Sequence, residues 1–296
     1  MAAPWTSKRK LICAQIFDFD VETTLVFENY KRRRDSTYDP DYGKLCDLEE
    51  VFDRPSCNLS QIFTTTLDVI YENNGHILQS LRDQEWLTDG YELFAAAIQA
   101  KGAALANCWG FIDGTVRPMC RPQEGQQVCY NGHKRTHALK YQSITAPNGL
   151  IANMFGPVEG SRHDSALLRM SGIILELSEI QINGEQGCIY GDPAYPLRPE
   201  IQVPFRNPTP DQQMFNASMS AVRISVEWTF GKIVENFAFL DYKKNHKLCL
   251  QPIGKMYLVA ALLVNCHTCL YGSETTDFFH IDPPSLEEYL QYYDYE

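Results

Sequence analysis

Three acidic residues occupy positions from which a fold could bring them to one site. Asp113 and Asp192 each end a short apolar run beside a glycine, and Glu227 follows further along the chain. Carboxylate oxygens are the ligands that Mg²⁺ prefers, and two such ions can activate a water and assist the departing oxygen in phosphodiester hydrolysis. About three carboxylates from separate elements are needed to hold such a pair while leaving room for phosphate. The pattern is therefore compatible with metal-dependent cleavage of a phosphate ester.

Asp113 is the acid that most needs a compensating partner. It lies in Trp109–Thr115, where the apolar residues are typical of a buried strand. A lone carboxylate there loses solvation unless a cation or hydrogen-bond donors compensate. We therefore expect a positive group or a set of donors at Asp113.

The elements that would position Asp113 and Asp192 follow from the apolar spacing. A Pro-Asn-Gly turn between the runs 138–145 and 150–155 predicts a hairpin, so three antiparallel strands are expected with Asp113 on the first. Residues 187–192 read as a further short strand, which Pro193 ends.

Helices are expected to carry the remaining candidates. Asn216 would cap a helix whose apolar stripe runs from Met219 to Phe237, with Glu227 at its border and Arg223 one turn earlier. Arg223 would orient Glu227, or the two would form an ordinary helical ion pair. Asp164 precedes another helix, either as its cap or as a second partner of the acidic site.

The region before Asp113 is predicted to be helical. Two apolar faces at helical spacing cover residues 45–71, with a break at Arg54–Ser56, and residues 92–106 form another helix. Because 58–71 contains no Lys or Arg, we expect the second helix to pack rather than to read DNA.

The charge of the chain is divided unevenly. The net charge is −11, but residues 1–100 carry −7, residues 101–273 carry +3 and residues 274–296 carry −7. Metal bound to the three acids would make the middle still more positive toward a phosphate backbone. The densest group of basic residues in this middle part is His133, Lys134, Arg135, His137 and Lys140. The group would either contact DNA phosphates or form a solvated strand edge.

Location and redox state are predicted from the same composition. The longest apolar run, 257–264, is too short to span a membrane, and no secretory signal is present, so we expect no membrane association. We therefore expect the ten cysteines to be reduced thiols. Cys266 and Cys269 form one C-x-x-C pair, which is half of a zinc-binding motif, and we favour buried thiols over a zinc site. Lys31–Arg34 is either a nuclear-import signal or solvated surface.

Four blocks of sequence, in order, resemble the DDE nucleases of PIF/Harbinger transposases and their domesticated relatives. They are Cys108–Thr115, Gly160–Ser165, Tyr190–Pro196 and Arg223–Gly231. The resemblance implies an α/β RNase H-like core with a mixed sheet. It also implies a nuclear DNA endonuclease that uses Mg²⁺ or Mn²⁺, with Asp113, Asp192 and Glu227 as metal-binding catalytic residues.

The resemblance also implies a domain plan and partners. We expect a poorly assigned segment at 1–46, a helical region at 47–107, the nuclease domain at 108–272 and an acidic tail at 273–296. Relatives tend to rely on a Myb-like protein for DNA recognition, and assembly into homo-oligomers would be consistent with the family.

Two alternatives remain open. A domesticated protein could retain the fold but bind chromatin or a partner without catalysis. The Asp18-x-Asp20 pattern also resembles the phosphate-transfer loop of haloacid-dehalogenase-like phosphatases, although Glu22 departs from it. Loss of nicking on substitution of Asp192, with no effect of Asp18→Ala, would favour the nuclease.

Overall fold

The structure is a computed structural model that describes residues 49, 52–240 and 251–291. The chain divides into two compact units, Met1–Asn73 and Asn74–Glu296. The predictions for Asp18-x-Asp20, for Lys31–Arg34 and for the segment 1–46 lie outside the described residues. Each unit is considered separately below.

The first unit contains the helix α4, Ser56–Asn74. It begins at the predicted break, where the Ser56 backbone N–H donates to the Glu49 carboxylate. Leu59, Leu67 and Ile70 are buried, which confirms the predicted apolar face of this helix.

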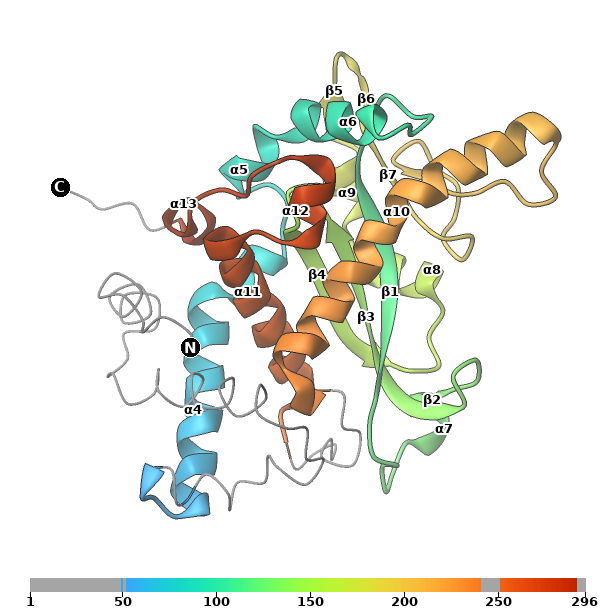
Figure 1. Cartoon of the computed structure of the whole chain (residues 1–296). Coiled ribbons are helices and arrows are strands. Elements are labelled where there is room, and N and C mark those ends of the chain that lie inside the picture. Colours follow the sequence, from blue (N-terminus) through green and yellow to red (C-terminus); the bar gives the residue numbers. More distant parts are fainter. Residues whose placement is uncertain (1–48, 50–51, 241–250, 292–296) are drawn as a thin grey trace. The chain divides into compact units, whose positions relative to one another are not determined.

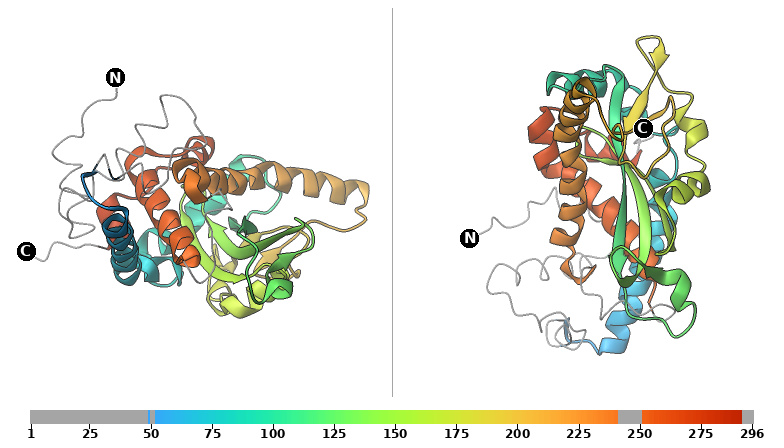
Figure 2. Two further views of the ribbon diagram at one scale, coloured as in Figure 1. Left: turned by 90° about the horizontal axis from the view of Figure 1, so that it is seen from below. Right: turned by 90° about the vertical axis from the view of Figure 1, so that its right-hand side faces the viewer.

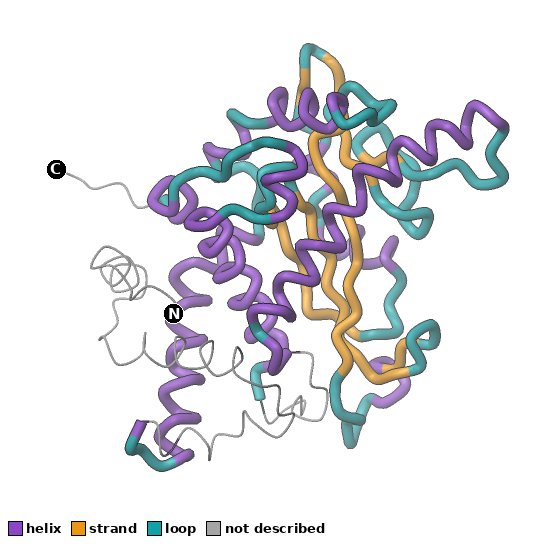
Figure 3. Tube along the Cα trace, in the orientation of Figure 1, coloured by secondary structure: helices purple, strands orange, loops and turns teal. Residues whose placement is uncertain are grey.

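The second unit has a mixed α/β fold built on one sheet. Its elements, coloured by type in Figure 3, are η1 Gly75–Leu78, α5 Glu85–Thr88, α6 Tyr91–Ala100, β1 Cys108–Pro118, α7 Gln126–Cys129, β2 Tyr130–Asn131, β3 Thr136–Thr145, β4 Ile151–Glu159, α8 Asp164–Ser171, α9 Ile174–Leu177, β5 Gln181–Ile182, β6 Glu185–Gln186, β7 Cys188–Tyr190, β8 Ile201–Gln202, α10 Pro210–Asn236, η2 Ala238–Leu240, α11 Ile253–Tyr271, α12 Glu274–Phe279 and α13 Leu286–Leu290.

The sheet combines an antiparallel meander with two parallel strands. β1 pairs antiparallel with β3, and β3 pairs antiparallel with β4. On the other side, β1 pairs parallel with β7, which pairs parallel with β8. This order is compatible with the RNase H-like core that the sequence predicts, and the expected hairpin across 147–149 is confirmed.

Helices cover both faces of this sheet. α10 crosses one face and contacts β1, while α8 packs against β3 and β4. Figure 2 shows, in the right-hand view, α10 and α11 on one side of the strands and the short helices α8 and α9 on the other. Apolar residues are therefore required on both faces, and Trp109, Phe111 and Ile112 of β1 are all at most 1% exposed.

α10 begins earlier than the sequence predicts. Its cap is Thr209, whose hydroxyl accepts from the Gln212 backbone N–H in a capping box, with Pro210 in the first turn. The prediction that Asn216 caps the helix is therefore wrong, because Asn216 lies inside it. Met219, Val222, Val226 and Ile233 are buried, which confirms the predicted stripe.

The segment after residue 272 packs as part of the core. α12 and α13 bury Phe279, Leu286 and Tyr289, and Phe279 stacks on Phe111 of β1 with ring centroids 6.2 Å apart. The segment is acidic as predicted, but its described residues do not form a separate tail. The helices η1, α5 and α6 fall in the second compact unit, Asn74–Glu296.

α11 is long and apolar enough to cross a membrane by length and composition alone, although 67% of its apolar window is buried inside the fold. Burial of this extent is what a core helix requires. Its Asn265 side chain is fully buried and closes the open edge of β4. The amide accepts from Ile151 N (2.9 Å), donates to Ile151 O (2.8 Å) and donates to the Tyr289 hydroxyl (2.8 Å).

Replacing Asn265 by Ala should lower the free energy of unfolding by about 2 kcal/mol, because buried backbone groups of Ile151 lose their partners. Urea denaturation followed by circular dichroism measures this change. The exposed Asp282 of the same C-terminal region provides the control, since Asp282→Ala should change stability by less than about 0.5 kcal/mol. Equal stability of the two variants would contradict the role given to Asn265.

Candidate active site

Asp113 lies within β1, and Asp192 lies two residues beyond the end of the neighbouring parallel strand β7. Phe111 of β1 is in register with Tyr190 of β7, so the two acids stand at matching positions two residues further on. Gly191 permits this approach, since a Cβ at that position would lie 2.8 Å from the Ile112 side chain. The predicted pairing of two strand-end acids is thus a direct result of the parallel register.

Asp113 is compensated by one cation and one backbone donor. The Arg223 guanidinium of α10 donates to Asp113 Oδ2 at 2.9 Å, and Gly114 N–H donates to Asp113 Oδ1 at 2.8 Å. Burial nevertheless raises the pKa of Asp113, and the charges of Asp192 and Asp164 raise it further. Arg223 is therefore the positive group expected beside Asp113. The ionised carboxylate of Asp113 is still disfavoured by its burial and by the neighbouring acids.

Arg223 has a different partner from the one that helix spacing predicts. The arginine pairs with Asp113 rather than with Glu227, although Glu227 follows it by one turn on the same helix. The ion pair is largely buried, with 16% of the Asp113 side chain exposed. Arg223 thus links α10 to the middle of the sheet.

Asp192 is held by the turn that follows it. Its Oδ1 accepts from Ala194 N–H at 2.9 Å, and its carbonyl accepts from Tyr195 N–H at 3.2 Å. Pro193 ends the strand as predicted, so the turn places the half-buried carboxylate just beyond β7.

Asp164 forms a buried ion pair and is not a helix cap. Lys140 Nζ donates to Asp164 Oδ1 at 2.7 Å and to the Arg162 carbonyl at 2.9 Å. The residue at the cap position of α8 is His163, which makes no capping hydrogen bond through its side chain. The cap prediction for Asp164 is therefore wrong, and the alternative of a second partner to the acidic site agrees with its effect on the pKa of Asp113.

Gly114 is the point where these groups meet. A Cβ at this position would lie 2.5 Å from Asp164 Oδ1 and 3.7 Å from the Tyr195 hydroxyl. The glycine directly after Asp113 therefore makes room for a carboxylate and a phenol behind the strand. This explains the Asp-Gly pair from which the sequence argument began.

Tyr195 is a site residue that the sequence argument missed. Burial raises its pKa, and the charges of Asp164, Asp113 and Asp192 raise it further. Within the described part of the chain its buried hydroxyl has no hydrogen-bond partner. The signal was its position in the Tyr190–Pro196 block, three residues after Asp192.

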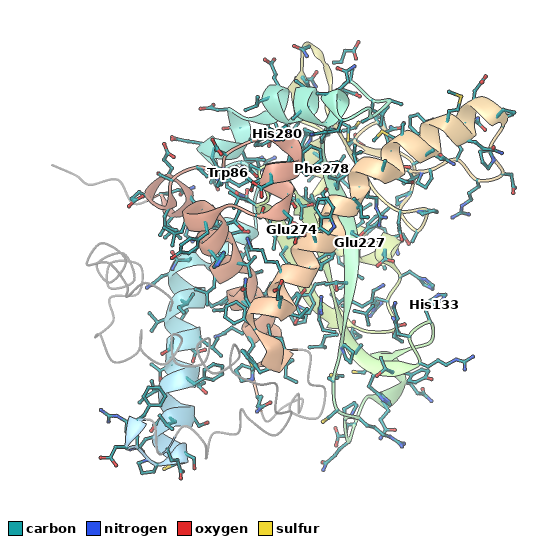
Figure 4. All side chains as sticks on the ribbon, viewed as in Figure 1. Trp86, His133, Glu227, Glu274, Phe278 and His280 are labelled. Carbon is teal, nitrogen blue, oxygen red and sulfur yellow. The ribbon has the colours of Figure 1, made fainter. Side chains whose placement is uncertain are left out.

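Glu227 is exposed on α10, near the level where the helix crosses β1 (Figure 4). Over residues 52–240 and 251–291, no three His, Cys, Asp or Glu side chains are grouped closely enough to hold a metal ion. The charges of Asp192 and Asp164 thus act on Asp113, whereas Glu227 is not among the groups that shift the pKa of Asp113.

The predicted basic group is split between surface and interior. His133, Lys134 and Arg135 are exposed in the loop between β2 and β3, where Figure 4 labels His133, and the half-buried His137 packs its ring against Tyr130. Lys140, in contrast, is only 6% exposed and is held by Asp164. Its ammonium is therefore committed to the interior rather than presented to phosphate.

Cys266 and Cys269 lie one turn apart in α11. Burial raises the pKa of Cys269, which disfavours the thiolate that zinc would require. Cys266 is buried in this helix, as the preferred prediction has it, while Cys269 is partly exposed.

The acids around Asp113 would gain from a nearby cation, although their side chains in the described residues are not grouped closely enough to hold a metal ion. Burial raises the pKa of Asp113 most, and the charges of Asp192 and Asp164 raise it further even with Arg223 in contact, so a positive charge would relieve that repulsion. The oxygen-only donor set is the one that hard cations such as Mg²⁺ prefer.

Comparison with known proteins gives one match. A family model described as DDE superfamily endonuclease matches residues 112–265, more than half of the chain. The match begins beside Asp113 and includes Asp192 and Glu227. No curated protein and no solved structure matches the chain.

Proposed function

Since the chain belongs to the DDE superfamily endonuclease family, we propose that it is a metal-dependent DNA endonuclease of transposase origin, of the PIF/Harbinger type. The observation that carries the proposal is the placement of Asp113, within β1, and Asp192, just beyond the parallel strand β7, at matching positions where the charge of Asp192 acts on Asp113. The Asp113 carboxylate has no structural value in this position by itself, because burial and the neighbouring acids disfavour its ionised form in the fold.

Asp113, Asp192 and Glu227 would hold the cation, Mg²⁺ or Mn²⁺. When bound, the metal supplies an activated water and charge stabilisation for the departing 3′ oxygen. Arg223 keeps the Asp113 carboxylate in one orientation through its ion pair, and the backbone N–H of Gly114 fixes the other oxygen. The turn at Ala194 does the same for Asp192.

Glu227 would join Asp113 and Asp192 from α10. Its position one turn beyond Arg223 gives it access to the same edge of β1, because Arg223 already reaches Asp113 from this helix. A side chain on an exposed helical position can change rotamer at little cost, so Glu227 could turn toward Asp113 to bind a cation.

DNA is the proposed substrate, and the exposed residues His133, Lys134 and Arg135 are proposed to contact its phosphates. Sequence-specific recognition would come from a Myb-like partner, because α4 contains no Lys or Arg. Nuclear localisation and homo-oligomer assembly follow from the same proposal.

Nicking of a supercoiled plasmid tests the proposed function. The wild type should convert it to the open circle with Mg²⁺ or Mn²⁺ and should be inactive in EDTA. Glu227→Gln should lower the rate by about a hundredfold, since the neutral amide of Gln binds a divalent cation more weakly than the carboxylate of Glu. The matched control on the same helix is Asp211→Asn, which should retain wild-type activity.

Two outcomes would contradict this assignment. No nicking by the wild type under any divalent cation would favour the non-catalytic alternative, a chromatin- or partner-binding protein that retains the fold. Loss of phosphate-ester hydrolysis in Asp18→Ala, with Glu227→Gln unaffected, would favour the phosphatase alternative.

A further inference from the structure

The loop at residues 193–209 joins Asp192 to α10 and is called here the Phe205 loop. It leads to the part of α10 that extends past the sheet, as Figures 1 and 2 both show. Because the loop starts directly after Asp192, whatever it binds lies next to this acid.

Phe205 is held in place by a dedicated side chain. Asn216 of α10 accepts from Phe205 N–H at 2.9 Å and donates to the Phe205 carbonyl at 3.0 Å. The Phe205 ring also meets the Phe215 ring edge to face, with centroids 5.2 Å apart. These contacts hold the backbone of Phe205 and its ring against α10.

The Phe205 ring remains available to a ligand. It is 42% exposed, and two other apolar residues of this region are more so, Leu197 at 64% and Met214 at 73%. Phe215 in turn packs against Tyr190 at the end of β7, so a line of aromatic rings runs from the strand beside Asp192 to the surface.

A cation stands beside this aromatic surface. Arg206 donates from Nη2 to the Pro193 carbonyl at 2.8 Å, which fixes the guanidinium one residue from Asp192. Arg198 is a second exposed arginine of the loop, and Glu200 is its sole acid within 193–209.

We propose that the Phe205 loop binds a DNA strand with one unstacked base on the Phe205 ring and the adjacent phosphate on Arg206. The proposal rests on the proposed nuclease function. An exposed aromatic ring and a neighbouring arginine are the combination that holds single-stranded nucleic acid, since every base offers a π-face. The arginines favour DNA over a protein partner, as does proximity to the acids at which a phosphodiester would be cut. The preferred substrate is thus duplex DNA that is unpaired near the cut.

Fluorescence anisotropy with the full chain tests this. The probes are a fluorescein-labelled duplex and the same duplex with three central unpaired nucleotides, both in EDTA so that cleavage does not interfere. The wild type should bind the unpaired probe about tenfold more tightly, because stacking on an aromatic ring contributes roughly that factor. Phe205→Ala should remove the preference without weakening duplex binding, while Phe205→Trp and the control Leu175→Ala, at an exposed leucine of α9, should keep it.

Arg206→Ala should weaken binding of both probes and reduce the slope of log K against log salt concentration by about one. The proposal would be overturned if Phe205→Ala still bound the unpaired probe more tightly than the duplex, or if the wild type showed no such difference. Either result would favour a protein partner for this surface. Nicking is measured separately, so a wild type that shows the preference but does not nick would refute the proposed function and not this one.

Discussion

Replacing Asp113 by Asn is expected to lower DNA nicking by about a thousandfold or more, because a central metal ligand loses its charge. The same change should leave the metal-free protein at least as stable as the wild type. Burial and the charges of Asp192 and Asp164 raise the pKa of Asp113, so its ionised form is disfavoured in the fold. An amide of the same shape removes that cost, and its single oxygen can accept from either Arg223 or Gly114 N–H but not from both.

The pH dependence of this stability difference has a definite sign. A carboxyl group with a raised pKa in the fold binds its proton more tightly when folded, so its contribution to stability falls as pH rises through the folded pKa. The advantage of Asp113→Asn should therefore be present at neutral pH and should disappear below about pH 4, the ordinary value for Asp.

Plasmid nicking and thermal unfolding with and without Mg²⁺ measure both effects. The wild type should gain thermal stability on addition of Mg²⁺, and Asp113→Asn should not. Asp282→Asn, a change at an exposed acid, serves as the control for loss of charge alone. Activity of Asp113→Asn within tenfold of the wild type would refute the assignment of Asp113.

Replacing Lys140 by Met should lower the free energy of unfolding by about 3 kcal/mol, because the Asp164 carboxylate would be left without its partner. The Lys140 side chain is 7% exposed and that of Asp164 20%, so water can only partly replace the lost contact. Since Asp164 lies against Gly114, the variant should also nick more slowly than the wild type, by a smaller factor than Asp113→Asn.

A double-mutant cycle separates the ion pair from general packing. Lys140→Met combined with Asp164→Asn should be more stable than Lys140→Met alone, since no unpaired charge remains. Urea denaturation gives the four stabilities. Lys134→Met, at an exposed position in the preceding loop, should change stability by less than about 0.5 kcal/mol. Strict additivity of the two substitutions would show that Lys140 and Asp164 do not interact.

The strands of the site could be predicted because local signals fix them. The Pro-Asn-Gly turn specifies the hairpin, and the apolar runs that end at Asp113 and Gly191 specify buried strands. The pairing of β1 with β7 has no such local signal, because it joins residues far apart in the sequence. Only the fold shows that Asp113 and Asp192 are adjacent.

The partners of charged residues were harder to predict. Lys140 was grouped with the basic residues before it, although the apolar residues on both sides already indicated burial. Its partner Asp164 approaches from α8, on a separate element, so no spacing rule connects the two. The capping predictions failed for a related reason, since Asp and Asn are also the residues that bind a buried lysine or a backbone edge.

The contact between Asn265 and the edge of β4 has a consequence for how the protein is made. Asn265 and Tyr289 are synthesised after all the strands, yet together they complete the hydrogen bonding of Ile151. While the chain grows on the ribosome, β4 therefore presents an open edge that can pair with other chains. We expect the backbone groups of Ile151 to stay unpaired until α11 has left the ribosome, and the Tyr289 hydroxyl of α13 then holds the Asn265 amide in place.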